Sequence, residues 1–560
     1  MGLGVLEPST TTHVAGTVLL NEAAAHSLPQ TGNLKHGTGR DKNVVLAPQP
    51  SDDPNDPLNW SSFEKHTIIG VLCYGAITST TVVGPLLAAG TVEVSVDLGV
   101  SVTDIALLTG YLLLAAGASG FFVSALARKF GKRPLYLLSS LLAVVGCIIG
   151  EVAKEYSTLV GARVIQGLAM AAYESLILTS IGDLFFVHER GTRVSAVMFI
   201  LTAINNGVSI IAGVITARFG WSYNFHILLP FTTLQFILVF LFVPETSYNR
   251  SKIYETDIIG SNVNLEELGD VEAAAGTPDE PTKESVGSEE IENVRTCTTL
   301  PRRKSFRQRL AVWNGVFVED SLIKMLLSCP AILLNVAALY NVVVSGVTIT
   351  WSVGTSIISA VLWSAPPYSL SPAGIGYVST GPLIGGTLGL IVYGLIADPL
   401  IKAVARRNKG VYEPEFRLPV IVIGLIPTVA GLVGFGYACQ NSVSIYLISF
   451  AWGVLMFGLF ISAAVNSAYV LDAMREHSTE IFIMNMVFKN FFFYGISDYG
   501  IDWLMTQGVS SMSNVMAGIS AGLILTSVPM YIYGKRYRSF WQHHNLIKRW
   551  HLETEKAGDE

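Results

Sequence analysis

Long apolar stretches alternate with short polar ones along most of the chain. A helix that spans a bilayer needs about 20 mostly apolar residues. Twelve stretches meet this length, at 66–89, 103–126, 133–153, 158–182, 193–216, 223–243, 328–353, 373–397, 418–439, 444–470, 480–505 and 512–534. A charged segment separates the sixth from the seventh. The pattern predicts an all-α membrane protein with twelve transmembrane helices in two six-helix halves.

The same pattern divides the chain into five parts. Residues 1–65 are rich in small and polar residues and contain no apolar run long enough for a signal peptide, so we expect a disordered cytoplasmic segment. The two halves are expected at 66–244 and 325–535. Between them, 245–324 reads as a cytoplasmic linker that begins acidic and ends basic, and 536–560 as a cytoplasmic tail.

Lysine and arginine are distributed unevenly between alternate loops. If the N-terminus is cytoplasmic, the outer loops hold little more than Lys154 and Arg218. The inner loops and the tail hold a larger set: Arg128, Lys129, Lys132, Arg133, Arg190, Arg193, Lys402, Arg406, Arg407, Lys409, Arg417, Arg475, Lys535, Arg536 and Arg538. This asymmetry predicts cytoplasmic N- and C-termini. The expected location is the plasma membrane, with the vacuolar membrane as the alternative.

Composition supports a lipid environment and argues against several other classes of protein. Hydrophobic residues make up 51% of the chain and charged residues 14%, with a mean hydropathy of +0.49; soluble proteins are about a quarter charged. The net charge of −6 gives no sign of a nucleic-acid partner. The five cysteines are scattered, and no phosphate-binding loop, metal-ligand spacing or GxSxG motif occurs. We therefore expect neither an enzyme nor a cofactor.

A short motif recurs after the second stretch of each half. The first copy is "SALARKFGKRP" (124–134), and the second lies in "GLIADPLIKAVARR" (394–407). The repeat indicates a duplicated six-helix unit, an architecture in which secondary transporters place the substrate site near the midplane, between the halves.

These motifs resemble those of the major facilitator superfamily. The 124–134 loop is similar to its G-x-L-A-D-R-x-G-R-K-P signature, "RVIQGLAMA" (163–171) to its R-x-x-Q-G motif, and "PETSYNR" (244–250) to the P-E-T after the sixth helix. "SDDPNDPLNW" (51–60), "NSAYVLDAM" (466–474) and "FKNFFFYGISDY" (488–499) look like fungal members of the 12-helix drug:proton antiporter group. The resemblance implies a monomeric transporter that works by alternating access.

The resemblance also implies that the repeated loops form a cytoplasmic gate. Its expected residues are Arg128, Lys129, Gly131, Lys132, Arg133 and Asp398. Arg128 stands where the family usually has an aspartate that latches the inner side, so we expect a lopsided gate in which Asp398 alone keeps that role. The antiporter pattern of the fifth helix is reduced to Gly213, and this feature keeps an uptake alternative open.

Two charged residues in the fourth stretch are candidates for proton coupling. Glu174 and Arg163 are eleven residues apart, which places them on one helix face about 16 Å from each other. A partly desolvated carboxylate at this depth can take up and release a proton, so Glu174 is the predicted carrier. The alternative is a carboxylate locked in a structural role. The resemblance implies a coupling role for Arg163, with an interhelical clasp as the alternative.

Other polar residues within the apolar stretches are candidates for the substrate cavity: Asn206, Gln235, Tyr340, Asn341, Asn466 and Lys489. Each can instead make a helix–helix hydrogen bond. Lys489 can balance a substrate carboxylate, pair with Asp472, or extend its ammonium to the inner surface. Lys489 argues against a purely cationic substrate, whereas Glu174 argues for one. The glycines of "GPLIGG" (381–386) predict close helix packing.

These observations favour a proton-coupled secondary transporter that exports a drug, toxin or secondary metabolite by proton antiport. Its predicted partners are a small-molecule substrate, protons and the lipid bilayer. One alternative is proton-linked uptake of a small solute, including a cationic one. Another is a transporter-like nutrient sensor, for which the long 245–324 linker is the support.

Overall fold

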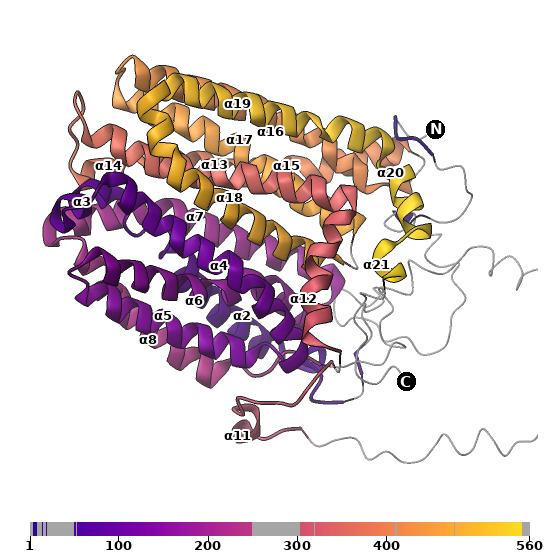
Figure 1. The fold of residues 1–560 in the computed structure, drawn as a ribbon. Helices are drawn as coiled ribbons and strands as arrows, with labels where there is room; N and C mark the ends of the chain where they lie inside the picture. The colour runs from indigo at the N-terminus through magenta and orange to yellow at the C-terminus, as the bar shows by residue number, and fades with distance from the viewer. Residues whose placement is uncertain are drawn as a thin grey trace, which may run out of the picture.

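The computed structural model describes residues 4–7, 14, 18–19, 50–51, 53–248, 303–318, 320–408, 411–474 and 477–550. Most of the expected 245–324 linker lies outside this part. The described chain is almost entirely helical and forms two helical layers (Figure 1). The first half is coloured indigo to magenta in the figure, and the second half salmon to yellow.

The helices follow the predicted stretches in chain order. The main helices of the first half are α2 (Ser62–Ala76), α4 (Val102–Phe130), α5 (Arg133–Val152), α6 (Tyr156–Leu184), α7 (Val187–Phe219) and α8 (Ser222–Phe242). Those of the second half are α13 (Val336–Ser364), α14 (Pro372–Val378), α15 (Thr380–Arg407), α16 (Ile421–Gln440), α17 (Ile445–Ala473), α18 (Ser478–Gln507), α19 (Val509–Leu525) and α20 (Ser527–His543).

Shorter elements complete the fold. They are the helices α3 (Thr91–Leu98), α11 (Phe306–Arg309), α12 (Leu322–Ala331) and α21 (Leu546–Arg549), the 3-10 turns η2 (Pro57–Asn59), η4 (Ala88–Gly90), η7 (Ile332–Leu334) and η8 (Pro414–Val420), the π-helical turn η3 (Ile77–Thr81), and the strands β1 (Val18–Leu19) and β2 (Val411–Tyr412). In Figure 1, α3 and α14 lie at one end of the layers, and α20 and α21 at the other. We call these ends the far face and the terminal face.

The all-helical, two-half fold class is confirmed. In the part of the chain that the structure describes, ten helices are long and apolar enough to cross a membrane. The other two predicted spans are helical as well. The eleventh is α18, which carries Lys489, Asp498 and Asp502, and the first is interrupted.

The interruption of the first span has a local cause. The helix α2 passes into the π-helical turn η3, and turns follow as far as η4. Pro85 lies in these turns, and a proline has no N–H to continue a helical hydrogen-bond ladder. Backbone carbonyls such as that of Val83 can therefore accept hydrogen bonds from other helices.

Glycines allow close helix packing within the second half. A Cβ on Gly381 would lie 2.0 Å from the carbonyl oxygen of Ser449, and one on Gly385 would lie 1.9 Å from that of Gly453. These distances leave no room for a side chain between α15 and α17. The packing predicted for "GPLIGG" is therefore confirmed.

The two halves approach each other closely toward the far face. A Cβ on Gly213 of α7 would lie 2.4 Å from the carbonyl oxygen of Pro372, at the start of α14. A Cβ on Gly110 of α4 would lie 3.1 Å from the Cβ of Ser497 in α18. Backbone and side chains thus fill the space between the halves at these two seams.

Segments near the N-terminus contact both halves at the terminal face. The amide of Leu6 donates to the carbonyl of Ile532 (3.0 Å), and β1 pairs with β2 in antiparallel fashion. Farther along, the hydroxyl of Tyr248 donates to Asp53 (3.0 Å). The described residues of 1–65 therefore make specific contacts with the helical halves.

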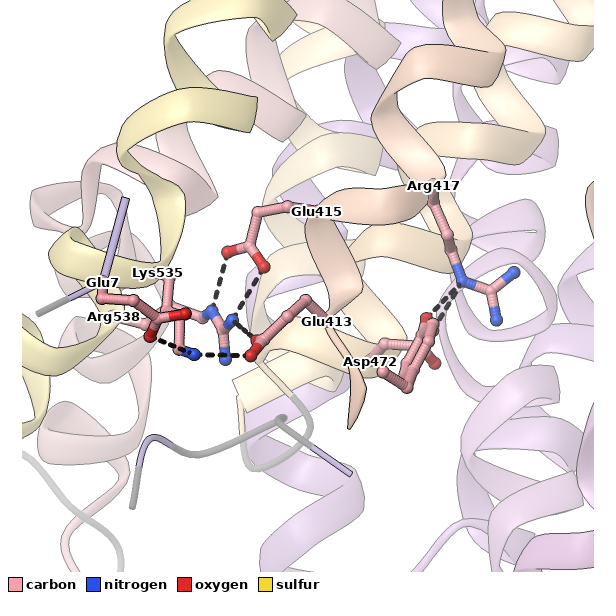
Figure 2. A network of polar contacts seen from close by, with 8 residues as sticks. Glu7, Glu413, Glu415, Arg417, Asp472, Lys535 and Arg538 are labelled. Atoms are coloured by element: carbon pink, nitrogen blue, oxygen red, sulfur yellow. Dashed lines mark hydrogen bonds and ion pairs between the residues drawn. The ribbon is translucent and has the colours of Figure 1, made fainter. Parts of the chain in front are cut away.

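A buried ionic network holds the terminal face of the second half together (Figure 2). Arg538 of α20 contacts Glu413 at 3.0 Å and Glu415 at 2.7 Å. Lys535 contacts Glu413 at 2.7 Å and Glu7 at 2.6 Å. The network joins the last long helix, the turn before α16 and the N-terminal segment.

Candidate functional site

Glu174 and Lys489 form an ion pair between the two halves. Glu174 lies on α6, ten residues before its end at Leu184, and Lys489 lies on α18, eleven residues after its start at Ser478. At 1.5 Å per residue, both side chains start about 15 Å from the terminal-face ends of their helices. The pair therefore lies deep between the halves, with side chains that are 15% and 17% exposed.

The groups around this pair have unused hydrogen-bonding capacity. The Nζ of Lys489 also donates to Oδ1 of Asn490 at 3.1 Å. Among the described residues, Oε2 of Glu174 and Nδ2 of Asn490 are buried and have no hydrogen-bond partner. An unpaired buried polar atom costs roughly 1–3 kcal/mol. Oε2 of Glu174 can therefore accept a hydrogen bond or a proton, and Nδ2 of Asn490 can donate a hydrogen bond to a ligand.

Aromatic residues lie near Lys489 in the sequence of α18 and on the adjacent helix α13. The rings of Phe488 and Phe492 stack at 5.8 Å, and Trp351 meets Phe492 edge-on at 5.7 Å. The hydroxyl of Thr350, next to Trp351, donates to the carbonyl of Lys489 at 3.3 Å. These aromatic residues thus lie where α18, the helix that carries Lys489, packs against α13.

The structure gives Lys489 a partner that differs from the one considered from sequence. Asp472 is paired with Arg417 at 2.5 Å and accepts a hydrogen bond from the hydroxyl of Tyr412. Burial and the Asp472 carboxylate raise the pKa of Tyr412, so this phenol stays a hydrogen-bond donor. Lys489 turns inward to Glu174 instead of extending to the terminal face.

Arg163 lies on the same helix as Glu174 but in a separate environment. It is fully buried, and its Nη1 donates to the carbonyl of Val83 (2.9 Å) and to Gln166 (3.1 Å). Its guanidinium lies 5.5 Å from the ring of Phe225. Its Nε and Nη2 have no partner among the described residues. Arg163 thus clasps α6 to the broken first span.

Most of the other cavity candidates make hydrogen bonds within one half. Gln235 accepts from Thr78 (2.5 Å) and donates to Ser79 (2.9 Å) inside the first half. In the second half, Tyr340 donates to Oδ1 of Asn466 (3.2 Å), and Asn341 donates to the carbonyl of Asn466 (2.8 Å). The side chain of Asn206 lies outside the described residues. A role for any of them in binding substrate stays a prediction.

The basic loop at 124–134 reaches across to the second half. Arg128, in the last turn of α4, pairs at 2.5 Å with Glu480, in the first turn of α18. A carboxylate at a helix N-terminus is also favoured by the helix dipole. Arg128 thus contacts the other half through a positive charge, at the position where the family motif has a negative one. Its role in a gate stays a prediction.

The rest of the loop is fixed by the first half. Gly131 has φ +90, and a Cβ there would lie 2.3 Å from a carboxylate oxygen of Glu245. Glu245 accepts from the amides of Lys132 (2.9 Å) and Arg133 (3.1 Å), and Asp183 pairs with Lys132 at 2.5 Å. These contacts explain why the P-E-T motif follows the sixth span.

Two further residues of the predicted gate, Lys129 and Arg133, also have partners in the structure. The Nζ of Lys129 donates to the carbonyl of Asp320 at 3.0 Å, so the segment before α12 is fastened to the same loop. The guanidinium of Arg133 is buried and donates to several carbonyls, including that of Phe240 at 2.9 Å. The side chain of Asp398 lies outside the described residues. The partners Glu480, Asp183 and Glu245 were not singled out from sequence.

Comparison with known proteins decides the family. The family model described as Major Facilitator Superfamily matches residues 67–490. The chain belongs to the major facilitator superfamily. An uncharacterized transporter of this superfamily type from Schizosaccharomyces pombe is 24% identical over 94% of this chain and 92% of its own length. Protein HOL1 of Saccharomyces cerevisiae is 25% identical, over 92% and 93%.

Other relatives agree with this assignment. The MFS transporter cpaT of Aspergillus oryzae is 24% identical over 87% of this chain and 90% of its own length. A crystal structure of the peptide transporter POT superposes with a TM-score of 0.52 at 12% identity, covering 83% of this chain and 93% of that one. The resemblance to fungal superfamily transporters is thus confirmed, and the chain is a multi-pass membrane transporter.

Proposed function

We propose that this superfamily member is a proton-coupled secondary transporter that moves a small organic compound across the membrane by alternating access, exporting it in exchange for protons. The plasma membrane, a monomeric state and a cytoplasmic terminal face belong to the same proposal. The basic loops on that face support this orientation.

The observation that carries the proposal is the Glu174–Lys489 ion pair. It joins α6 of one half to α18 of the other, so it is made and broken by the same motion that opens a path between the halves. Protonation of Glu174 removes the negative charge and with it most of the attraction. One proton can therefore change the relative stability of the closed and open arrangements, which is what coupling requires.

The electrostatic surroundings of Glu174 are simple. On α6 the described basic group is Arg163, and it is engaged with Val83 and Gln166 instead of Glu174. On the neighbouring helix α4, the charged residues Asp104, Arg128 and Lys129 lie in the first and last turns. Among the described residues, Lys489 is the charged group that pairs with Glu174.

The proposal is tested by measuring luminal pH in proteoliposomes that hold the purified full chain. A panel of hydrophobic drugs, fungal metabolites, amino acids and polyamines is added outside. We expect at least one compound to cause a proton flux that is lost in Glu174→Gln. The sign of the flux separates export by antiport from proton-linked uptake.

Glu155→Gln is the matched control. Glu155 is an exposed carboxylate that precedes the first turn of the same helix, so its replacement should leave the flux unchanged. A substrate-driven proton flux that survives in Glu174→Gln would remove Glu174 from the coupling mechanism. Substrate movement without any proton flux would contradict proton coupling itself.

A further inference from the structure

The ion pair also bears on the chemistry of the substrate. We infer that the group recognised at Glu174 is an organic ammonium, and that Lys489 is a resident ammonium ligand which the substrate displaces. This inference rests on the proposed transport function. It deepens that function by naming a substrate class.

The first argument is chemical equivalence. The group now bound to Glu174 is a primary ammonium on a four-carbon chain, and a protonated amine is the same group on another carbon skeleton. Oε2 of Glu174 has no partner among the described residues, so an incoming ammonium can bind this oxygen before Lys489 leaves the other one. Displacement then proceeds without exposing a bare buried carboxylate.

The second argument is the aromatic composition of α18 next to Lys489. Phe488 and Phe492 flank Lys489 in sequence, and Trp351 packs against Phe492. Aromatic faces attract cations, and they also cover the apolar body of an organic cation. A carboxylate at a seam whose other helix carries several aromatic residues suits an ammonium with an apolar substituent.

The third argument concerns the fate of the displaced lysine. Its Nζ already donates to Oδ1 of Asn490, and its long flexible chain can move away from Glu174 while keeping this contact. An anionic substrate on Lys489 would instead separate the pair and leave Glu174 as an uncompensated buried charge. Exchange of one ammonium for another keeps the carboxylate neutralised throughout.

This arrangement resolves the conflict found in the sequence. When the two residues are treated separately, Glu174 argues for a cationic substrate and Lys489 argues against one. As partners, they form an electrically neutral site in which Lys489 sets the minimum binding strength that a substrate must have. A substrate ammonium binds only if its contacts exceed those of the lysine it replaces.

The test is a binding measurement on the purified full chain in detergent, using benzylammonium and phenylacetate as ring-bearing probes of opposite charge. Affinity is measured by calorimetry without a proton gradient. We expect wild type to bind benzylammonium, Glu174→Gln to lose this binding, and Lys489→Met to strengthen it by about tenfold, because the competing ligand is gone. Lys489→Arg keeps the charge and should bind like wild type.

Several outcomes would overturn the inference. They are binding of phenylacetate that depends on Lys489, benzylammonium binding that survives in Glu174→Gln, and weaker benzylammonium binding in Lys489→Met. If Lys489→Met does not fold, wild type, Lys489→Arg and Glu174→Gln still decide between cation and anion. A proton flux driven by a neutral compound, without benzylammonium binding, would overturn this inference and leave the proposed function intact.

Discussion

At the scale of single residues, several charges in the described interior are held by specific partners. Arg538 is the clearest example at the terminal face, since Glu413 and Glu415 enclose it (Figure 2). Its pairing partners lie in a turn that precedes α16, more than a hundred residues earlier in the chain. The arginine therefore links segments that are distant from each other in the sequence.

We predict that Arg538→Met lowers the stability of the protein by about 3–5 kcal/mol, because it leaves Glu415 buried without its counter-charge and leaves Glu413 with Lys535 alone. Thermal melting of the purified protein in detergent measures the effect. Arg536→Met is the control, since Arg536 is exposed and donates to the backbone carbonyl of Glu7. Equal melting temperatures for the two variants would contradict this role for Arg538.

The same residue scale shows what the sequence could and could not predict about the site. Glu174 and Lys489 were both identified as candidates, because ionisable residues are rare and costly within apolar stretches. Their mutual pairing was not predicted. The sequence offered Asp472 as a nearer partner for Lys489, and only the packing of α6 against α18 shows that Asp472 belongs to Arg417.

At the scale of elements, the hydropathy pattern predicted the positions of the helices, and the spacing of glycines predicted one of the closest helix–helix contacts. Gly381, Gly385 and Gly389 recur every four residues along α15, so they share one face of the helix, which lies against α17. Hydropathy alone did not predict the interruption of the first span, because an apolar window records side chains and not backbone hydrogen bonds. The residue that indicates the interruption is Pro85, because proline lacks the N–H that a helix needs at this position.

We predict that Gly385→Ala lowers stability by about 1–3 kcal/mol, since the added methyl group would overlap the backbone of Gly453. Gly394→Ala on the same helix is the matched control. A Cβ at Gly394 meets nothing within 4 Å, so this substitution should be neutral or stabilising by up to about 1 kcal/mol. Denaturation of both variants in detergent measures the difference, and loss of stability in Gly394→Ala alone would contradict the packing.

At the scale of the whole molecule, two ion pairs among the described residues connect the halves, and both use α18. Arg128–Glu480 lies at the terminal face, and Glu174–Lys489 lies deeper. The family signature predicted that a gate would form at the 124–134 loop. Its charge arrangement could not be predicted from the motif, because the partner of Arg128 lies in a different helix of the other half.

We predict that Arg128→Glu favours conformations in which the terminal-face ends of the halves separate, because two carboxylates then face each other. Spin labels at the exposed residues Ser62 of α2 and Phe540 of α20 measure this as a longer distance distribution. The exchanged pair Arg128→Glu with Glu480→Arg should restore the wild-type distribution. Failure of the exchange to restore it would show that the contact does not act through charge.

The central claim is that a proton and an organic ammonium compete for the carboxylate of Glu174. The most direct test is the number of protons released when benzylammonium binds to the purified protein in weak buffer, from about pH 5 to about pH 8. We predict that binding of benzylammonium is accompanied by proton release, and that the affinity for benzylammonium falls as the pH is lowered. Binding that releases no protons anywhere in this range would contradict the claim.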